Sequence, residues 1–277
     1  MPELPEVETI RRDLQKLLPG RVIRDVNLYF QGFVKYPSPG EFIARLRGKK
    51  ILKTGRRGKY LFLYLSGGFR LVVHLRMTGR LLYYPETTPP TSHTRGVFLF
   101  SGGDELHFHD VRKFGTMWLV KGEDISRVGG LQGLGPEPLE AEFTPAFLHG
   151  RCQKTGRPLK SLLLSQEAAA GIGNIYADEA LFKAGLSPDR RADSLNLEEA
   201  KKLWAAVRQV LQEGILARGT SRRDYLDAGG RAGSYQECLR VYGRKGQECP
   251  HCRCVIERIT IAGRSSHFCP ACQPRRP

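Results

Sequence analysis

The 277-residue sequence lacks any run that is long and apolar enough to span a bilayer. Its opening residues also lack the apolar core of a signal peptide, because charged side chains are spread through them: Glu3, Glu6, Glu8, Arg11 and Arg12. A lysine-rich amphipathic helix and a low-complexity basic tail are missing as well, which disfavours a membrane-surface protein. We expect a globular, cytoplasmic protein without a membrane partner.

Acidic residues are scarce relative to basic ones. The chain has 44 Lys and Arg against 28 Asp and Glu, a formal net charge of +16 and a pI near 9.8. Such an excess favours a polyanionic partner, with nucleic acid as the leading candidate, and predicts salt-sensitive binding. With 40% hydrophobic residues, the chain is long enough for a sizeable core and about two domains.

Signs of a disulfide framework are also missing, because seven cysteines is an odd number and nothing marks the chain for secretion. Four cysteines form two C-x2-C pairs, Cys249 with Cys252 and Cys269 with Cys272, separated by sixteen residues. This spacing is typical of a tetrahedral zinc site, and four thiolates leave no open position for a reacting water. The sequence therefore predicts one structural Zn²⁺. Three further cysteines are expected to be plain thiols, although the last lies close to the pairs: Cys152, Cys238 and Cys254.

The first part of the chain reads as a helix followed by short strands. Apolar residues recur at three- and four-residue steps from Leu4 to Leu17, and Pro19-Gly20 ends the run. Two hairpin signals follow, around Gly67-Gly68 and around residues 101–104. Several short strands at this spacing predict an antiparallel sandwich or barrel, with strands at residues 21–28, 50–54, 60–65, 69–75, 97–100, 105–109 and 116–120.

Glycine and proline then cluster before a helical region, which suits a linker. Asn196 and Glu199 resemble a capping box at the start of the longest expected helix. Helices are predicted over residues 145–150, 158–164, 174–184 and 197–216. We therefore expect an α+β chain of four parts. An N-terminal sandwich domain (1–130) is followed by a linker (131–143), a helical domain (144–236) that includes a loop (221–235), and a zinc module (237–277). The zinc module is expected to form a hairpin from residues 255–261 and 265–268 that aims Arg264.

Pro2 and Glu3 allow a specific chemistry. If Met1 is removed, the Pro2 nitrogen becomes a secondary amine that can attack an electrophilic sugar carbon and give an iminium ion. The neighbouring Glu3 carboxylate can donate or accept a proton. By themselves, however, the two residues also fit an ordinary helix start, where proline and acidic side chains are favoured.

Several motifs together give the chain its resemblance to a known family: Pro2-Glu3-Leu4-Pro5-Glu6-Val7-Glu8-Thr9, Arg57-Gly58-Lys59-Tyr60, His74-Leu75-Arg76-Met77, Asp110-Val111-Arg112-Lys113-Phe114-Gly115, Gly171-Ile172-Gly173-Asn174-Ile175-Tyr176 and the four-cysteine knuckle. In this order they resemble bacterial formamidopyrimidine-DNA glycosylase along essentially the whole chain. The N-terminal octapeptide and the zinc tail are its most specific parts. The resemblance implies a monomeric base-excision repair enzyme that binds damaged double-stranded DNA, removes oxidised purines such as 8-oxoguanine and then nicks the strand by β,δ-elimination.

The resemblance also implies catalytic roles. Pro2 would form the Schiff base with the sugar, and Glu3 would move protons at the sugar ring oxygen. Lys59 would contact a phosphate near the lesion and donate a proton in β-elimination. Arg264 is implied in phosphate binding and δ-elimination, and we favour the phosphate contact because a guanidinium is a poor proton donor.

Further residues are implied in holding DNA. Met77, Arg112 and Phe114 would fill the gap that an extruded nucleotide leaves in the base stack; without the family, Met77 and Phe114 read as core residues and Arg112 as a surface charge. Asn174 would contact a phosphate at a helix start within a helix-two-turns-helix motif, or would only cap that helix. The remaining implied DNA contacts are His93 and, more weakly, His74 and Tyr242.

Two regions of the sequence, and the function itself, allow more than one interpretation. The loop at 221–235, which contains Arg222, Arg223 and Arg231, either closes over the extruded base or is a disordered connector. Near Thr155, where relatives carry a DNA-binding lysine, Lys154 or Arg157 could substitute. The alternatives for function are endonuclease VIII-like excision of oxidised pyrimidines, disfavoured by Leu4, and a noncatalytic zinc-dependent binder of damaged DNA.

Overall fold

The computed structural model describes residues 1–222 and 224–275, which form two compact units. The first unit contains Met1–Gln132 and Ala217–Gln236, and the second contains Gly133–Leu216 with the described residues from Glu237 onward. Residues 217–236, assigned from the sequence to the helical domain, thus pack with the N-terminal unit. In the described ranges, every helix is too short or too polar to pass through a bilayer.

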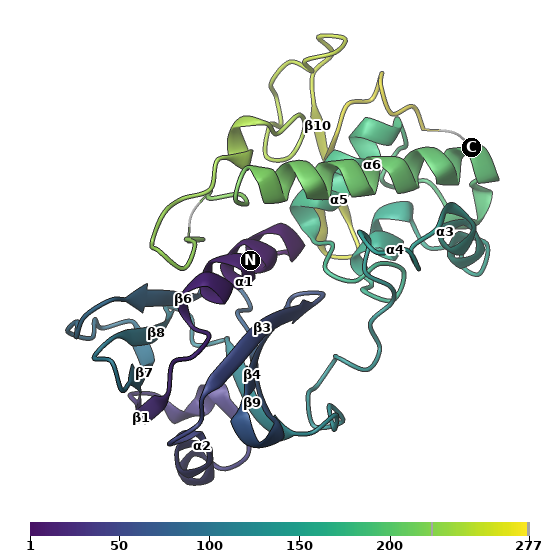
Figure 1. Cartoon of the computed structure of the whole chain (residues 1–277). Coiled ribbons are helices and arrows are strands. Elements are labelled where there is room, and N and C mark those ends of the chain that lie inside the picture. Colours follow the sequence, from purple (N-terminus) through teal and green to yellow (C-terminus); the bar gives the residue numbers. More distant parts are fainter. Residues whose placement is uncertain (223, 276–277) are drawn as a thin grey trace. The chain divides into compact units, whose positions relative to one another are not determined.

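The first unit begins with helix α1 (Leu4–Leu17). Its apolar face is fully buried through residues at the predicted steps, including Leu4, Ile10 and Leu14. The helix packs against strands β3 (Ile51–Arg57) and β4 (Tyr60–Leu65) (Figure 1). This packing places the N-terminal residues beside the sandwich.

Two sheets form the sandwich (Figure 1). The four-stranded sheet has the order β1-β7-β8-β6, with strands Ile23–Leu28, Thr94–Phe100, Glu105–Asp110 and Gly79–Tyr84. The five-stranded sheet has the order β2-β9-β5-β4-β3, in which the strands not yet given are Val34–Tyr36, Thr116–Lys121 and Phe69–His74. Side chains from both sheets and from α1 share one apolar core, in which Phe33 and Phe108 meet edge to face at 5.1 Å.

The strand predictions are confirmed in most places. The β4–β5 and β7–β8 hairpins form as expected, and Gly67 and Gly68 adopt the positive φ of 73° that their turn requires. The sequence patterns did not predict α2 (Pro39–Leu46), β2 or β6. The antiparallel sandwich is confirmed, with one pair that departs from it: β2 runs parallel to β9.

The second unit is helical, with α3 (Pro145–Cys152), α4 (Leu159–Leu164), α5 (Asn174–Ala184) and α6 (Leu197–Leu216). Helix α6 packs against α3 and α5 (Figure 1). The capping box is confirmed, since Asn196 and Glu199 exchange backbone-to-side-chain hydrogen bonds of 3.2 and 2.9 Å. The unit ends in a hairpin of β10 (Glu257–Ile261) and β11 (Arg264–Phe268), which packs on α5. Arg264 is the first residue of β11 rather than part of the turn.

Candidate DNA-binding and catalytic site

Pro2 and Glu3 lie at the start of α1, in the first unit. Both are buried, Glu3 to 2% exposure, whereas Met1 is 51% exposed. The Glu3 backbone N–H donates to the Glu6 carboxylate at 2.7 Å, which fixes the first turn of the helix. The Pro2 nitrogen, which becomes an amine only once Met1 is removed, and the Glu3 carboxylate therefore occupy a sheltered position on adjacent residues, where little water competes for the carboxylate.

The turn that carries Lys59 is tied to the same helix. Arg56 bridges the two, since its Nε donates to Glu8 at 3.2 Å and its Nη1 donates to the Gly58 carbonyl at 3.0 Å. Burial raises the pKa of Glu8, but hydrogen bonds from Arg11 and Arg12 and the charges of Arg11 and Arg56 outweigh it and lower the pKa to about 2. The charged Glu8 thus anchors the segment leading to Lys59, which is itself buried to 7% exposure.

His74 lies opposite Tyr60 in the β4–β5 register, and their rings meet edge to face at 4.6 Å. Burial, together with the positive charges of Arg76 and Lys59, lowers the pKa of His74 to about 3, so the ring is neutral at pH 7. Its Nδ1 accepts the Arg76 backbone N–H at 3.0 Å. The proton is therefore on Nε2, where it is available as a neutral donor.

Met77, Arg112 and Phe114 come together on the surface of the first unit, although they belong to two different turns. The Arg112 Nη1 lies 3.1 Å from the Met77 Sδ, and the guanidinium stacks 4.7 Å above the Phe114 ring. Met77 and Phe114 are 40% and 49% exposed, so neither is a core residue. An exposed apolar pair flanking a cation is suited to entering a base stack.

Asp110 organises this cluster, a role that the motif at residues 110–115 does not predict by itself. It is 1% exposed and accepts the backbone N–H groups of Gly115 at 2.7 Å and Arg112 at 3.2 Å. It also bonds to the Thr78 hydroxyl, which in turn accepts the Arg112 N–H at 3.1 Å. The sequence feature that indicates this role is an aspartate directly before a turn that contains polar residues, since such a carboxylate often accepts the N–H groups of the turn. His93 is exposed and its carbonyl accepts the Asp110 N–H at 2.9 Å.

In the second unit, Asn174 is the first residue of α5 and Gly173 is its N-cap. The Asn174 side chain does not cap the helix, and its buried Oδ1 has no hydrogen-bond partner among the residues that the structure describes. Gln166 shapes the preceding turn, because its amide donates to Ile172 O at 2.7 Å and accepts from Gly171 N at 2.9 Å. The capping alternative for Asn174 is therefore wrong, and its side chain stands at a helix N-terminus where an anion is favoured.

Arg264 and Tyr242 belong to segments that are attached to α5 by buried charges. Asp178 is fully buried, pairs with the fully buried Lys160 at 2.6 Å and accepts the His267 N–H at 2.9 Å. Lys160 also donates to the carbonyl of Ser265, the residue after Arg264. Glu179 likewise accepts the backbone N–H groups of residues 240, 241 and 242. Arg264 itself is exposed, and Tyr242 is half-buried with its ring 5.2 Å from that of His267.

Lys154 is exposed and lines a surface pocket of about 250 Å³. The other lining residues are Arg151, Thr155, Arg157, Leu162 and Glu167. Three of the six side chains are cationic and one is anionic, so the pocket carries a net positive charge suited to phosphate. Lys154 and Arg157 thus lie together beside Thr155.

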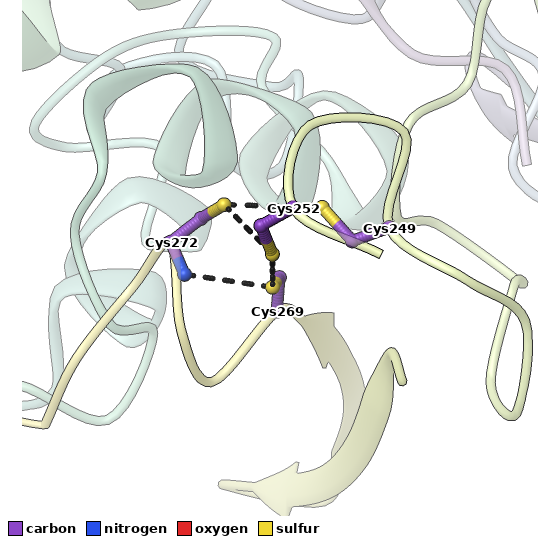
Figure 2. A group of neighbouring side chains, drawn as sticks. All are labelled: Cys249, Cys252, Cys269 and Cys272. Carbon is purple, nitrogen blue, oxygen red and sulfur yellow. Dashed lines mark hydrogen bonds between the residues drawn. The ribbon is translucent and has the colours of Figure 1, made fainter. Parts of the chain in front are cut away.

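The four predicted zinc ligands converge at the base of the hairpin (Figure 2). Their Sγ atoms lie within 4.8 Å of one another, with pairs at 3.8, 3.4 and 3.5 Å. Tetrahedral zinc with Zn–S bonds of about 2.3 Å places its sulfurs about 3.8 Å apart, whereas a disulfide requires about 2.05 Å. The four thiols fit one structural Zn²⁺: Cys249, Cys252, Cys269 and Cys272. Cys254 lies outside the group.

The β-sandwich unit, the helical unit and the four-cysteine hairpin together define a class, the DNA glycosylases that combine an H2TH domain with a zinc finger. Family models match in three blocks: the formamidopyrimidine-DNA glycosylase N-terminal domain at residues 1–117, its H2TH domain at 134–225, and a zinc finger found in FPG and IleRS at 246–275. The chain belongs to the formamidopyrimidine-DNA glycosylase family.

Similar proteins cover the chain from end to end. The formamidopyrimidine-DNA glycosylase of Pelotomaculum thermopropionicum is 49% identical over 99% of both chains. The crystal structure of the MutM (Fpg) protein from Thermus thermophilus is 44% identical, covers 100% of both chains and superposes with a TM-score of 0.90. A Lactococcus lactis Fpg, solved with DNA containing Fapy-dG, is 34% identical over 99% of this chain and 100% of that one, with a TM-score of 0.91.

Proposed function

We propose that the chain is a bifunctional DNA glycosylase and abasic-site lyase that excises oxidised purines from double-stranded DNA. The observation that carries this proposal is the sheltered Pro2-Glu3 pair on a unit that also exposes Met77, Arg112 and Phe114. A binding protein would need only the exposed cluster. The buried amine and carboxylate are the parts that chemistry requires.

In the proposed reaction, Met1 is removed and the damaged nucleotide is turned out of the duplex. The Pro2 nitrogen attacks C1′ of the sugar, the C1′–N bond to the base breaks, and the base leaves with a proton. Glu3 supplies a proton to the ring oxygen as the sugar opens, which leaves an iminium ion between Pro2 and C1′.

Strand cleavage follows from the iminium ion, which makes the C2′ proton acidic. Loss of this proton expels the 3′ phosphate, and a second elimination expels the 5′ phosphate. Lys59 is proposed as a phosphate contact and proton donor in the first elimination, and Arg264 as a phosphate contact during the second. Water then hydrolyses the iminium ion and frees Pro2.

The remaining residues are proposed to hold the DNA. Met77, Arg112 and Phe114 fill the vacated stack, with Arg112 facing the widowed cytosine. Phosphates are contacted by cations or neutral donors: His74, His93, Lys154, Asn174 and Tyr242. We also propose that the protein acts as a monomer in the cytoplasm, where bacterial DNA lies. The proposed domains are a sandwich domain (1–130), with which residues 217–236 pack, a linker (131–143), a helical domain (144–216) and a zinc module (237–277).

Borohydride trapping tests the proposal, because it reduces the iminium ion to a stable adduct. Protein without Met1 is expected to form a covalent complex with a duplex containing 8-oxoguanine opposite cytosine. Replacing Pro2 with glycine is expected to lower the trapped yield while DNA affinity changes little. Absence of an adduct with the processed wild type would leave only the noncatalytic binder. Faster turnover of a thymine glycol duplex would instead support endonuclease VIII-like specificity.

A further inference from the structure

Arg218 has a backbone conformation that is unusual for its residue type. It lies just after α6, in the first unit, with a φ of +59°. A side chain with a Cβ disfavours this left-handed region, so such a residue persists only where its surroundings hold it. The same position starts the segment that leads into residues 221–235.

Contacts of the Arg218 side chain stabilise this backbone conformation. Its Nη2 donates to Asp13 on α1 at 2.5 Å, and its Nε donates to Asp227 at 3.1 Å. Asp13 is 9% exposed and Asp227 is fully buried. One planar guanidinium thus joins the N-terminal helix to the middle of the loop, a geometry that a lysine cannot reproduce.

Asp227 in turn organises the loop. Its Oδ1 accepts the backbone N–H groups of Gly229 and Arg231, both at 2.9 Å, and its Oδ2 accepts from the Arg231 side chain at 3.2 Å. Burial raises the pKa of Asp227, but bonds from the Arg231 backbone and from Arg218 outweigh it, so the pKa is lowered. The carboxylate is therefore charged at neutral pH and binds Arg218 as an ion pair.

Two further contacts attach the segment to the same unit, one just before it and one in its middle. The Thr220 N–H donates to Glu6 at 2.7 Å, on the carboxylate that also binds the Glu3 N–H. The Tyr83 N–H on β6 donates to the Ala228 carbonyl at 2.9 Å. The loop is not a disordered connector over its described residues; Arg223 lies outside them.

We propose that Arg218 is a positioning residue, which holds residues 224–235 against α1 through Asp13 and Asp227 and thereby sets the rate of base removal. The inference rests on the proposed function and on the alternative given above in which this loop closes over the extruded base. An abasic sugar has no base to cover. Loss of Arg218 should therefore slow excision of a base much more than cleavage at an abasic site.

The test compares two variants on two substrates. Arg218→Gly removes the strain of the positive φ and both ion pairs, with Asp13 and Asp227. Arg218→Lys keeps the positive charge but cannot bond to both carboxylates with the planar geometry of a guanidinium. For Arg218→Gly, single-turnover excision of 8-oxoguanine is expected to fall about tenfold, while cleavage of a preformed abasic site changes less than about twofold. Arg218→Lys should fall between the wild type and Arg218→Gly. Arg47→Lys is the matched control, because Arg47 forms a similar two-pronged pair with Asp25 in the same unit.

Hydrogen exchange gives an independent readout of the loop. Amides of residues 224–235 are expected to exchange faster in Arg218→Gly than in the wild type, and those of β4 to be unchanged. Equal losses on both substrates, or unchanged exchange in the loop, would overturn the proposal. A wild type inactive on both substrates would refute the proposed function instead, and exchange would still report whether Arg218 holds the loop.

Discussion

The two units position their reactive residues by different physical means. In the first, α1 and both sheets share a continuous apolar core, and the site residues emerge from turns anchored in it. In the second, the hairpin that carries Arg264 has only a small apolar cluster: Phe182, Val241, Cys249, Ile256 and Cys269. Two residues of this cluster are zinc ligands.

The hairpin of the second unit therefore relies on metal ligation and buried charge where the first unit relies on apolar burial. The fully buried Lys160–Asp178 pair and the Glu179 carboxylate join α4 and α5 to the hairpin and to residues 240–242. Apolar burial is nondirectional and tolerates solution changes, whereas thiolate ligation and buried ion pairs depend on metal and on complete pairing. From this difference we expect the candidate residues of the two units to lose their structural support under different solution conditions.

Zinc removal should separate the two units most strongly, because it should destabilise the hairpin of the second unit and leave the first unit folded. Structural zinc contributes roughly 10–16 kcal/mol to folding in zinc-finger peptides, and this hairpin has little core to replace it. Chelation, or Cys252→Ser, is expected to lower DNA affinity at least about tenfold while amide protection in β4 and β5 persists. Native mass spectrometry measures the zinc, and Cys238→Ser, a change of an exposed cysteine outside the cluster, serves as control. Loss of β-sheet protection together with the metal would show that the units are not independent.

Glu3→Gln tests whether the first unit contributes chemistry rather than packing. The amide keeps the size of the side chain but cannot move a proton, so excision of 8-oxoguanine is expected to fall about 10²- to 10⁴-fold. DNA affinity and thermal midpoint should stay near wild type. Glu41→Gln, in the first turn of α2, is the control. A parallel fall in stability would mean that Glu3 acts only as a helix-start residue.

Lys160→Met tests the buried pair of the second unit. Leaving Asp178 charged and buried without its partner is expected to cost about 3–5 kcal/mol, measured by urea unfolding. Adding Asp178→Asn should recover part of the loss, because the amide oxygen still accepts the His267 N–H. Lys201→Met, at an exposed pair with Glu198, should change stability by less than about 1 kcal/mol. Equal losses of unfolding free energy in Lys160→Met and Lys201→Met would show that the buried pair does not stabilise the second unit more than an exposed pair does.

The acid stability of the first unit should depend on Glu8. Its pKa is lowered from 4.5 to about 2 in the folded protein. The unfolded chain therefore binds the proton more readily, so this stabilisation is complete above about pH 4.5 and is lost as the pH falls towards 2. The loss is at most about 3 kcal/mol, and Glu8→Gln should flatten the pH dependence of urea unfolding in this window. Glu123→Gln, at a side chain 93% exposed, should leave it unchanged.

The smallest expected effect concerns the basic pocket of the second unit. Lys154→Ala should weaken DNA binding similarly across sequences and reduce the slope of log K against log salt by about one unit. Binding titrations at several salt concentrations measure this slope. Lys35→Ala, a surface lysine of the first unit, is the control. An unchanged slope would remove Lys154 from the phosphate contacts and leave Arg157 as the candidate near Thr155.

Local patterns predicted much of this molecule. The α1 periodicity, the β4–β5 glycine turn and the Asn196 capping box each depend on residues close together in the chain, and each formed as expected. The zinc ligands were found from spacing, because two short C-x2-C turns need only one hairpin to meet. The parallel β2–β9 pair was not predicted, since its strands lie far apart in sequence. The turn after Asp110 is local, but its bond to Thr78 joins residues 32 positions apart and was not predicted either.

The sequence by itself determined the class of elements and the zinc ligands and supplied the candidate reactive residues, because these follow from composition, spacing and side-chain chemistry. Only the tertiary structure decided that Met77 and Phe114 are exposed, that Asn174 does not cap its helix, and that Arg218 joins the loop to α1. Exposure and ion pairing are set by what long-range packing places next to a residue, and no local pattern encodes that neighbour.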